Sequence, residues 1–444
     1  MTNALLPGLG GPLGQHARAR GPWFDPLPWS LLSATALYLV LVLRQVPCVQ
    51  TDATNAVNAF IRLCYSDIPI AFTQHGFGLG EPAFGGSEMF YPPVLGVVVL
   101  LTVRLAAALG ADISPDAPLQ TQLDGAQVFY GINMVLLFAA FLAWVLASMV
   151  LGRGSRGGRV RSWDAVLVAS SPIVLAVGLI NWDLLPIGMA AVGIALLARG
   201  RTFEAAVLVG LAAGAGIMAI GVAVAVVAHL GLGGRRRQAL TFALTSFAVW
   251  VVVHVPLLLS NPGAVRAFYA GPVDSEATYG SVWFVLQRLG LDVRAAGSLG
   301  FMLLVLFLLL VLARWYVRGA QPALGTAVGV VVFSSVLLAP GFTPQTGLWL
   351  LFALVLAGPR RSWVIALTLA QLAYFLAIWG LLSGHLTLAQ NGPEGLYHLA
   401  IVARVGVDGW LLYEFLGQAE GVASTGRRFR LSSPHPASRA RDVG

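Results

Sequence analysis

The sequence predicts an all-α protein that crosses a membrane many times. Of its 444 residues, 57% are hydrophobic and only 10% are charged, and the mean hydropathy is +0.80. Soluble globular domains carry about 25% charged residues, so this chain has too little polar surface to cover a soluble particle. Its apolar residues form runs long enough to span a bilayer, with short arginine clusters between them. These observations exclude a soluble enzyme, a secreted domain and a disordered chain.

Apolar runs of about 20 residues predict about twelve transmembrane helices. The expected spans are 27–43, 126–151, 163–180, 184–198, two short helices within 203–233 that turn near Gly214 and Gly216, 239–259, 298–317, 323–339, 346–358, 363–382 and 396–416. No small-residue cleavage site follows the first run, so we expect it to remain as a span. Between the first two spans lies a mixed segment, 44–124. Within it, we expect 93–110 to be a helix that enters the outer leaflet and returns.

The arginines orient these spans, because basic residues mark cytoplasmic loops. About 20 of the 27 basic residues then lie inside, and about twelve of the 19 acidic residues lie outside. This orientation predicts a cytoplasmic tail at 1–26, a transmembrane domain at 27–418 and a basic cytoplasmic tail at 419–444. It makes 44–124 a large first outer loop, and 260–297 a later one. Because the arginines form short clusters between apolar runs, as is typical of topology signals, we expect no nucleic-acid partner.

Both cysteines of the chain, Cys48 and Cys64, lie in the first outer loop. Outside the cytoplasm they can form a disulfide, which for a loop of this length stabilises by roughly 3 kcal/mol; two unpaired thiols are the alternative. No zinc-type cluster, P-loop or Rossmann fingerprint occurs, so no cofactor is firmly implied. The lone Asp183 of the second outer turn argues weakly against a divalent cation, since such sites collect several oxygen ligands.

Polar chemistry concentrates on the predicted outer face. A carboxylate such as Asp67, held near an apolar wall, can have a raised pKa and serve as a general base; a solvated or helix-capping aspartate is the alternative. Trp182 and Asp183 place an indole beside a carboxylate, a pairing that suits a sugar ring, although Asp183 could instead cap the next span. The spans hold few charges, and we expect Arg404 and Asp408, four residues apart, to pair with each other.

Other outer segments supply further candidate binding residues. Arg266 offers a fork of donors to a phosphate. Tyr279 and Trp283 can stack on sugars or belong to an interfacial aromatic belt. His254 lies near the outer end of its span, and Gln345 lies in a short outer turn.

Five segments in this order resemble the actinobacterial membrane proteins of glycosyltransferase family 87. They are Cys64-Tyr65-Ser66-Asp67-Ile68-Pro69, Tyr91-Pro92-Pro93, Ile180-Asn181-Trp182-Asp183-Leu184-Leu185, Tyr279-Gly280-Ser281-Val282-Trp283 and Phe342-Thr343-Pro344-Gln345. These proteins are similar to the polyprenol-phosphate-mannose-dependent α-mannosyltransferases. The resemblance implies a GT-C fold, in which the first outer loop contains juxtamembrane helices and the catalytic aspartate.

The resemblance also implies a reaction and its partners. A sugar, mannose or arabinose, would pass from a polyprenyl-phosphate donor to a glycolipid or polysaccharide acceptor, with inversion, at the extracytoplasmic face of the plasma membrane. Asp67 would be the general base and Asp183 would orient sugar hydroxyls. The candidate donors to the leaving phosphate are, in order, Arg266, His75, His254 and Gln345. Surrounding membrane lipids would be the other partners.

The chain departs from the family pattern at three basic positions. It has His75-Gly76 where Arg-Gly is common, Gly216-Ile217-Met218-Ala219 where Lys-x-Tyr-Pro is common, and no arginine within 273–276. These departures keep open an inactive relative that acts as an assembly partner. A transporter or flippase of lipid-linked sugars is a further alternative, and would need coupling residues inside the spans, for which Arg404 and Asp408 are the candidates.

Overall fold

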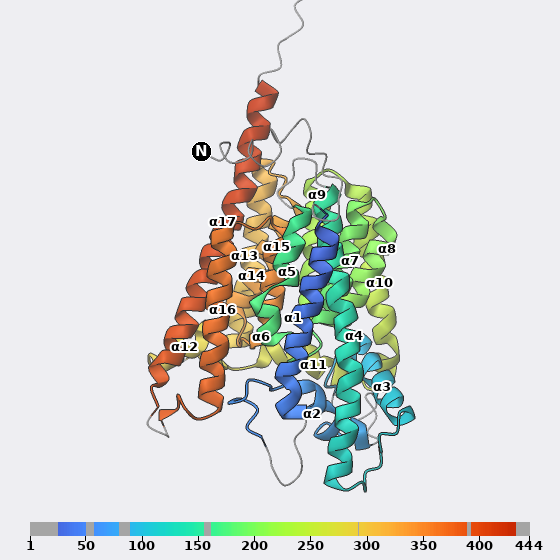
Figure 1. Ribbon diagram of the computed structural model, residues 1–444. Coiled ribbons are helices and arrows are strands. Elements are labelled where there is room, and N and C mark those ends of the chain that lie inside the picture. Colours follow the sequence, from blue (N-terminus) through green and yellow to red (C-terminus); the bar gives the residue numbers. More distant parts are fainter. Residues whose placement is uncertain are drawn as a thin grey trace, which may run out of the picture.

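The computed structural model describes residues 25–49, 57–79, 89–154, 161–291, 293–388 and 392–431, without the side chains of 153–154 and 420–431. These residues form helices and turns and no strand. The long helices lie side by side, and the short helices α2 (Asp67–Thr73), α11 (Pro262–Asp274) and α12 (Val282–Arg288) gather at one end of the bundle (Figure 1). We call this the α2 end.

Five described helices are long and apolar enough to cross a membrane. They are α1 (Pro26–Val49), α4 (Leu119–Gly154), α10 (Arg236–Ser260), α13 (Ala296–Arg318) and α16 (Arg361–Leu382). The shorter apolar helices are α3 (Pro93–Ala108), α5 (Ala165–Ala169), α6 (Pro172–Val177), α7 (Leu184–Ala198), α8 (Thr202–Ala213), α9 (Met218–Leu232), α14 (Leu324–Leu338) and α15 (Gly347–Leu356). The last helix, α17 (Glu394–Leu431), extends past the others at the end opposite α2 (Figure 1). Single 3-10 turns lie at η2 (Phe77–Leu79), η3 (Ser162–Asp164) and η4 (Pro344–Thr346).

Several predicted helices are confirmed. The run 203–233 forms α8 and α9, which are separated at 214–217 as expected. The expected helix at 93–110 is α3; its entry into the outer leaflet stays a prediction. The predicted tail 1–26 lies almost wholly outside the described residues. At the other end, α17 continues unbroken from the last predicted span to Leu431, into the range assigned to the second tail.

Other boundaries were wrong. The expected single span 163–180 is divided into η3, α5 and α6, because Ser171 caps Ile173 N and Pro172 has no N–H with which to continue the preceding helix. Helix α4 begins seven residues before the predicted start, inside the range assigned to the first outer loop. The expected outer loop 260–297 contains two short helices, α11 and α12, whose first turns are capped by the side chains of Asn261 and Ser281; its place outside the membrane stays a prediction.

Small residues set the spacing between several helices. A Cβ built on Gly188 of α7 would lie 2.6 Å from the carbonyl oxygen of Ala140 in α4, and one on Gly210 of α8 would lie 2.7 Å from that of Ser246 in α10. These helices therefore approach backbone to backbone. In a membrane such close packing drives association, since lipid tails are as apolar as leucine side chains.

The expected pairing of Arg404 and Asp408 is confirmed. Both side chains are buried in α17, with Arg404 Nη1 2.7 Å from Asp408 Oδ2. The guanidinium also donates to the carbonyl of Gly280 (2.8 Å) and lies 3.7 Å from the ring centroid of Phe342. The Tyr374 hydroxyl donates to the Phe342 carbonyl (2.8 Å). One buried cation thus fastens two loops of the α2 end to the bundle.

This arrangement predicts unequal effects of breaking and replacing the pair. Asp408→Ala leaves a buried guanidinium uncompensated, so we expect a loss of about 3–5 kcal/mol in unfolding free energy. The double variant Arg404→Met, Asp408→Leu removes both charges and should lose less. Thermal unfolding of the purified variants in detergent measures both. A double variant less stable than Asp408→Ala would contradict the assignment.

Candidate active site

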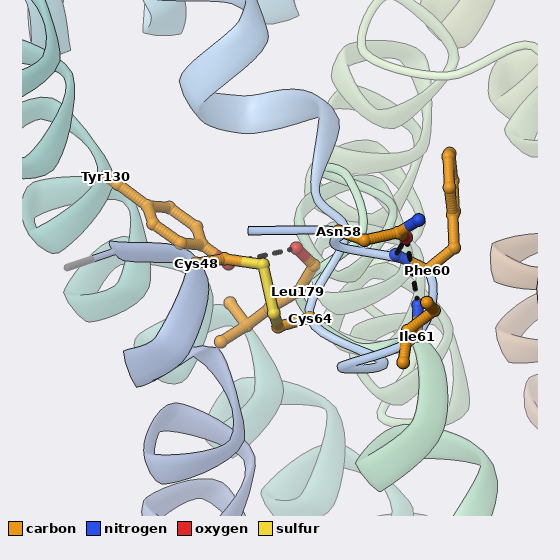
Figure 2. Close-up of a disulfide and its surroundings, with 7 residues drawn as sticks. All are labelled: Cys48, Asn58, Phe60, Ile61, Cys64, Tyr130 and Leu179. Atoms are coloured by element: carbon orange, nitrogen blue, oxygen red, sulfur yellow. Dashed lines mark hydrogen bonds between the residues drawn. A yellow bond between two sulfur atoms is a disulfide. The ribbon is translucent and has the colours of Figure 1, made fainter. Parts of the chain in front are cut away.

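A disulfide positions the segment that leads into α2. Cys48, at the end of α1, is bonded to Cys64, which confirms the expected pairing (Figure 2). Between them, the Asn58 side chain accepts hydrogen bonds from the N–H groups of Phe60 and Ile61 and closes a tight turn. Leu63 adopts a left-handed conformation (φ 57°), which a leucine holds only when its surroundings require it. The cross-link therefore ties a strained turn to the end of a long helix.

The start of α2 is fastened to the loop before α7. Ser66 caps α2 by accepting from Ile68 N, and its hydroxyl donates to the Ile180 carbonyl (3.2 Å). The same carbonyl accepts the N–H of Asp67 at 2.7 Å. Two bonds to one oxygen bring Asp67 beside the segment that carries Asp183.

Asp67 is partly buried among polar side chains at the first position of α2. Burial raises the pKa of its carboxyl, while a hydrogen bond from Tyr65 and the positive charge of His75 act in the opposite direction. His75 Nδ1 lies 3.2 Å from the Tyr91 hydroxyl, and its ring stacks on Phe90 at 4.3 Å. The carboxylate that sequence analysis singled out therefore lies beside a histidine and two phenols.

Asp183 is the second carboxylate of this cluster. Its Oδ2 accepts from Asn181 Nδ2 (3.1 Å) and its Oδ1 from Trp349 Nε1 (3.3 Å). Burial raises the pKa of Asp183 to about 6, and the charge of Asp67 contributes to the increase. The side chain makes no capping bond to α7, so the alternative role as a helix cap is not observed. Two carboxylates with raised pKa values thus share one site.

Aromatic rings form the walls of this site. Tyr91 meets Trp182 edge to face at 5.2 Å, and Trp182 is buried, with its N–H donating to Asn133 Oδ1 at 2.7 Å. Trp182 therefore packs against Tyr91 and is held in place by Asn133. On the other side of Asp67, the Tyr65 ring stacks on Phe60 at 5.0 Å.

Gln345, Tyr279 and Trp283 lie in or next to short loops. Gln345 belongs to η4, one helical turn before Trp349. The Tyr279 carbonyl accepts from Phe342 N, and the indole N–H of Trp283 donates to the Leu338 carbonyl (3.1 Å). Both residues thus contribute to loop packing.

The histidine and arginine candidates of α10 and α11 form a separate group. His254 is buried and contacts the Trp250 carbonyl (2.6 Å) and the Tyr269 hydroxyl (2.7 Å) through its two ring nitrogens. Arg266 is exposed on α11. Of the four residues expected to bind a phosphate, His75 is the one whose charge acts on Asp67.

Sequence reasoning did not assign a role to Tyr65, Tyr91, Asn133, Asn181 or Trp349, which complete the site. Tyr65, Tyr91 and Asn181 fall inside the motifs that carry the family resemblance, so the motifs contained the signal. Asn133 and Trp349 lie in apolar helices, where neither spacing nor composition distinguishes them. No group of three or more His, Cys, Asp or Glu side chains that could hold a metal ion occurs in the described ranges.

An apolar groove lies near this cluster. It encloses about 510 Å³ between α8, α9, α10 and Leu312 of α13, with Ala, Val, Gly and aromatic side chains along its wall. Two helices of the groove, α8 and α9, are joined by the turn 214–217. There the Gly214 carbonyl accepts from Val94 N (2.8 Å), and a Cβ on Gly216 would lie 3.0 Å from Pro186 and 3.9 Å from Trp349. The turn 214–217 thus lies between the groove and Trp349, the hydrogen-bond partner of Asp183.

The disulfide predicts a measurable contribution to stability. Replacing both Cys48 and Cys64 with serine should lower the unfolding free energy by about 3 kcal/mol, because the closed loop has a sequence separation of 16 residues. Thermal unfolding with and without reductant tests this. Reductant should lower the unfolding temperature of the wild type and leave that of the double variant unchanged. Equal unfolding temperatures for wild type and variant would contradict it.

Comparison with known families agrees with this architecture. The model of glycosyltransferase family 87 matches residues 89–340, which is more than half of the chain and includes Asp183. The match begins after Asp67. No curated protein matches the sequence. The all-helical polytopic bundle, with short helices around the carboxylates at one end, agrees with the GT-C fold that the resemblance implied. The chain therefore belongs to glycosyltransferase family 87 and is a membrane glycosyltransferase.

Proposed function

We propose that this protein transfers a sugar, mannose in the first instance, from a polyprenyl-phosphate donor to a hydroxyl of a glycolipid or polysaccharide acceptor, with inversion, at the outer face of the plasma membrane. The observation that carries the proposal is the pair Asp67 and Asp183, two carboxylates whose pKa values burial raises. A general base works best when its pKa is close to the working pH.

Asp67 is the general base in this mechanism. The acceptor hydroxyl attacks the anomeric carbon of the donor sugar from the face opposite the phosphate. Its proton passes to Asp67, and the bond between the anomeric carbon and the phosphate oxygen breaks with its electron pair on the phosphate. The product is a glycoside of inverted configuration, together with free polyprenyl phosphate. Tyr65 lowers the pKa of the Asp67 carboxyl and so favours the carboxylate form that accepts the proton.

Asp183 and His75 position the donor. Asn181 and Trp349 hold the two oxygens of Asp183, so this carboxylate presents a fixed set of acceptors to sugar hydroxyls. His75, fixed between Phe90 and Tyr91, supplies a donor to the leaving phosphate at a site where the common family residue is arginine. A phosphate needs such donors because negative charge develops on it as the bond breaks.

The apolar groove supports a lipid-linked donor. An isoprenoid chain needs an apolar surface that is open to the bilayer, and the wall of the groove is almost entirely hydrocarbon. Its position beside the turn 214–217 allows a chain in the groove to present its head group near Asp183. Arg404 and Asp408, the coupling candidates of a transporter, are bonded to each other and to a loop carbonyl, as expected of a structural pair.

The first prediction concerns Asp67. Asp67→Asn should lower sugar transfer by about 10²–10⁴-fold, because the amide cannot accept the proton. Transfer of radiolabelled mannose from polyprenyl-phosphate mannose by the purified chain measures this. Asp124→Asn is the matched control, since Asp124 is an exposed aspartate of α4. Undiminished turnover in Asp67→Asn would remove the base assignment, and no transfer by the wild-type chain would favour the inactive relative.

The second prediction concerns pH. Activity should rise with pH as the two carboxylates ionise, and the acidic limb should reflect a group with a pKa near 6. Trp349→Phe removes a hydrogen bond that favours ionised Asp183, so the pKa rises and the acidic limb moves to higher pH. The pH profile of kcat/KM measures the displacement. Trp163→Phe, an exposed indole, is the control; an unmoved limb in Trp349→Phe would refute the coupling.

A further inference from the structure

A second cavity lies between the end of α1, α2 and the start of α4. It encloses about 320 Å³, next to the Cys48–Cys64 disulfide (Figure 2 shows the disulfide and Tyr130). Its wall includes Tyr65, Thr73, Gln74, Ala126, Gln127 and Tyr130. Small-molecule sites typically have volumes of about 300–1,000 Å³, so the cavity has room for a sugar ring.

Hydroxyl and amide groups are the polar part of this wall, which is otherwise apolar. Among the residues that the structure describes, the lining has no Arg, His, Asp or Glu, and its polar side chains there are hydroxyls and amides. Among the described residues, the side-chain amide of the half-buried Gln127 has no hydrogen-bond partner, so a ligand can use both its donor and its acceptor. Sugar hydroxyls donate and accept at once and match such groups. A phosphate would instead require cations.

The cavity reaches the catalytic carboxylate through Tyr65. Tyr65 belongs to the cavity wall, and its side chain also acts on Asp67, where it lowers the pKa of the carboxyl. Along α2, residues 66, 69, 70, 73 and 74 face the cavity, and Asp67 lies seven residues from Gln74, at almost the same angle around the helix. Asp67 therefore lies at the edge of the cavity-facing side of α2. A sugar in the cavity can present a hydroxyl to the base.

The donor features lie elsewhere around Asp67. Asp183 is bonded to Trp349, and Trp349 adjoins the turn of α8 and α9 that borders the apolar groove. None of these residues belongs to the neutral cavity. We propose that this cavity is the acceptor subsite, which binds the neutral sugar that receives the transferred residue. The proposal rests on the proposed function and adds the location and chemistry of the acceptor.

Gln127→Ala tests the subsite by kinetics. With octyl α-mannoside as acceptor and polyprenyl-phosphate mannose as donor, in nanodiscs, the KM for the acceptor should rise about five-fold, the size expected from the loss of one neutral hydrogen bond. The KM for the donor should stay unchanged. Gln120→Ala, an exposed glutamine two turns earlier on α4, is the matched control. An unchanged acceptor KM, or an equal rise in both KM values, overturns the proposal.

Equilibrium binding separates this proposal from the proposed function. Tritiated octyl α-mannoside should bind the wild type and the control Gln120→Ala equally, bind Gln127→Ala about five-fold more weakly, and bind Ala126→Phe, whose ring fills the cavity, weakest of all. If octyl α-mannoside binding depends on Gln127 but the wild-type chain transfers no sugar, the acceptor subsite is supported and the proposed enzymatic function is refuted. If the wild-type chain transfers sugar but neither Gln127→Ala nor Ala126→Phe weakens octyl α-mannoside binding, the acceptor subsite is refuted. The absence of any binding to the wild type would also refute it.

Discussion

The carbonyl of Ile180 is the contact on which the site depends. It accepts the N–H of Asp67 and the hydroxyl of Ser66, and so joins α2 to the loop that carries Asp183. Without these two bonds, a helix of seven residues would have no fixed position, because so short a helix is marginal without tertiary contacts. The disulfide at Cys64 fixes the segment just before it. Both constraints act within three residues of the base, where small displacements change reactivity most.

Different kinds of bond hold the short segments at the α2 end. A covalent cross-link ties α2 to α1, backbone bonds tie it to the loop before α7, and the buried Arg404 ties the loops at Gly280 and Phe342 to α17. Loops at the edge of a bilayer gain little from the hydrophobic effect, so polar and covalent bonds must order them. Within the bundle, close backbone approach at Gly188 of α7 and Gly210 of α8 adds to the packing of the helices.

In the proposed reaction, the surroundings of Asp67 would separate the two substrates by their chemistry. Asp183, His75 and the apolar groove suit a charged head group on a lipid chain, whereas the cavity beside Tyr65 has hydroxyls and amides for a neutral sugar. Partial burial connects the two functions. It raises the pKa of both carboxylates, that of Asp183 to about 6.

Composition and periodicity alone determined the membrane class and the positions of most helices, because the hydrophobic effect acts on runs of residues that can be seen in one dimension. Asp67 was selected by a motif that resembles a known family, and its role stays a prediction. Local chemistry was harder to predict. Ser171 and Pro172 broke a predicted span, and caps at Asn261 and Ser281 begin short helices within the predicted outer loop 260–297. Only tertiary structure brought Trp349 to Asp183 across 166 positions of sequence and gave Gln127 a cavity to face. Such contacts depend on how the helices pack and on how each is rotated about its axis. Side-chain shape decides both, and hydropathy contains no information about shape.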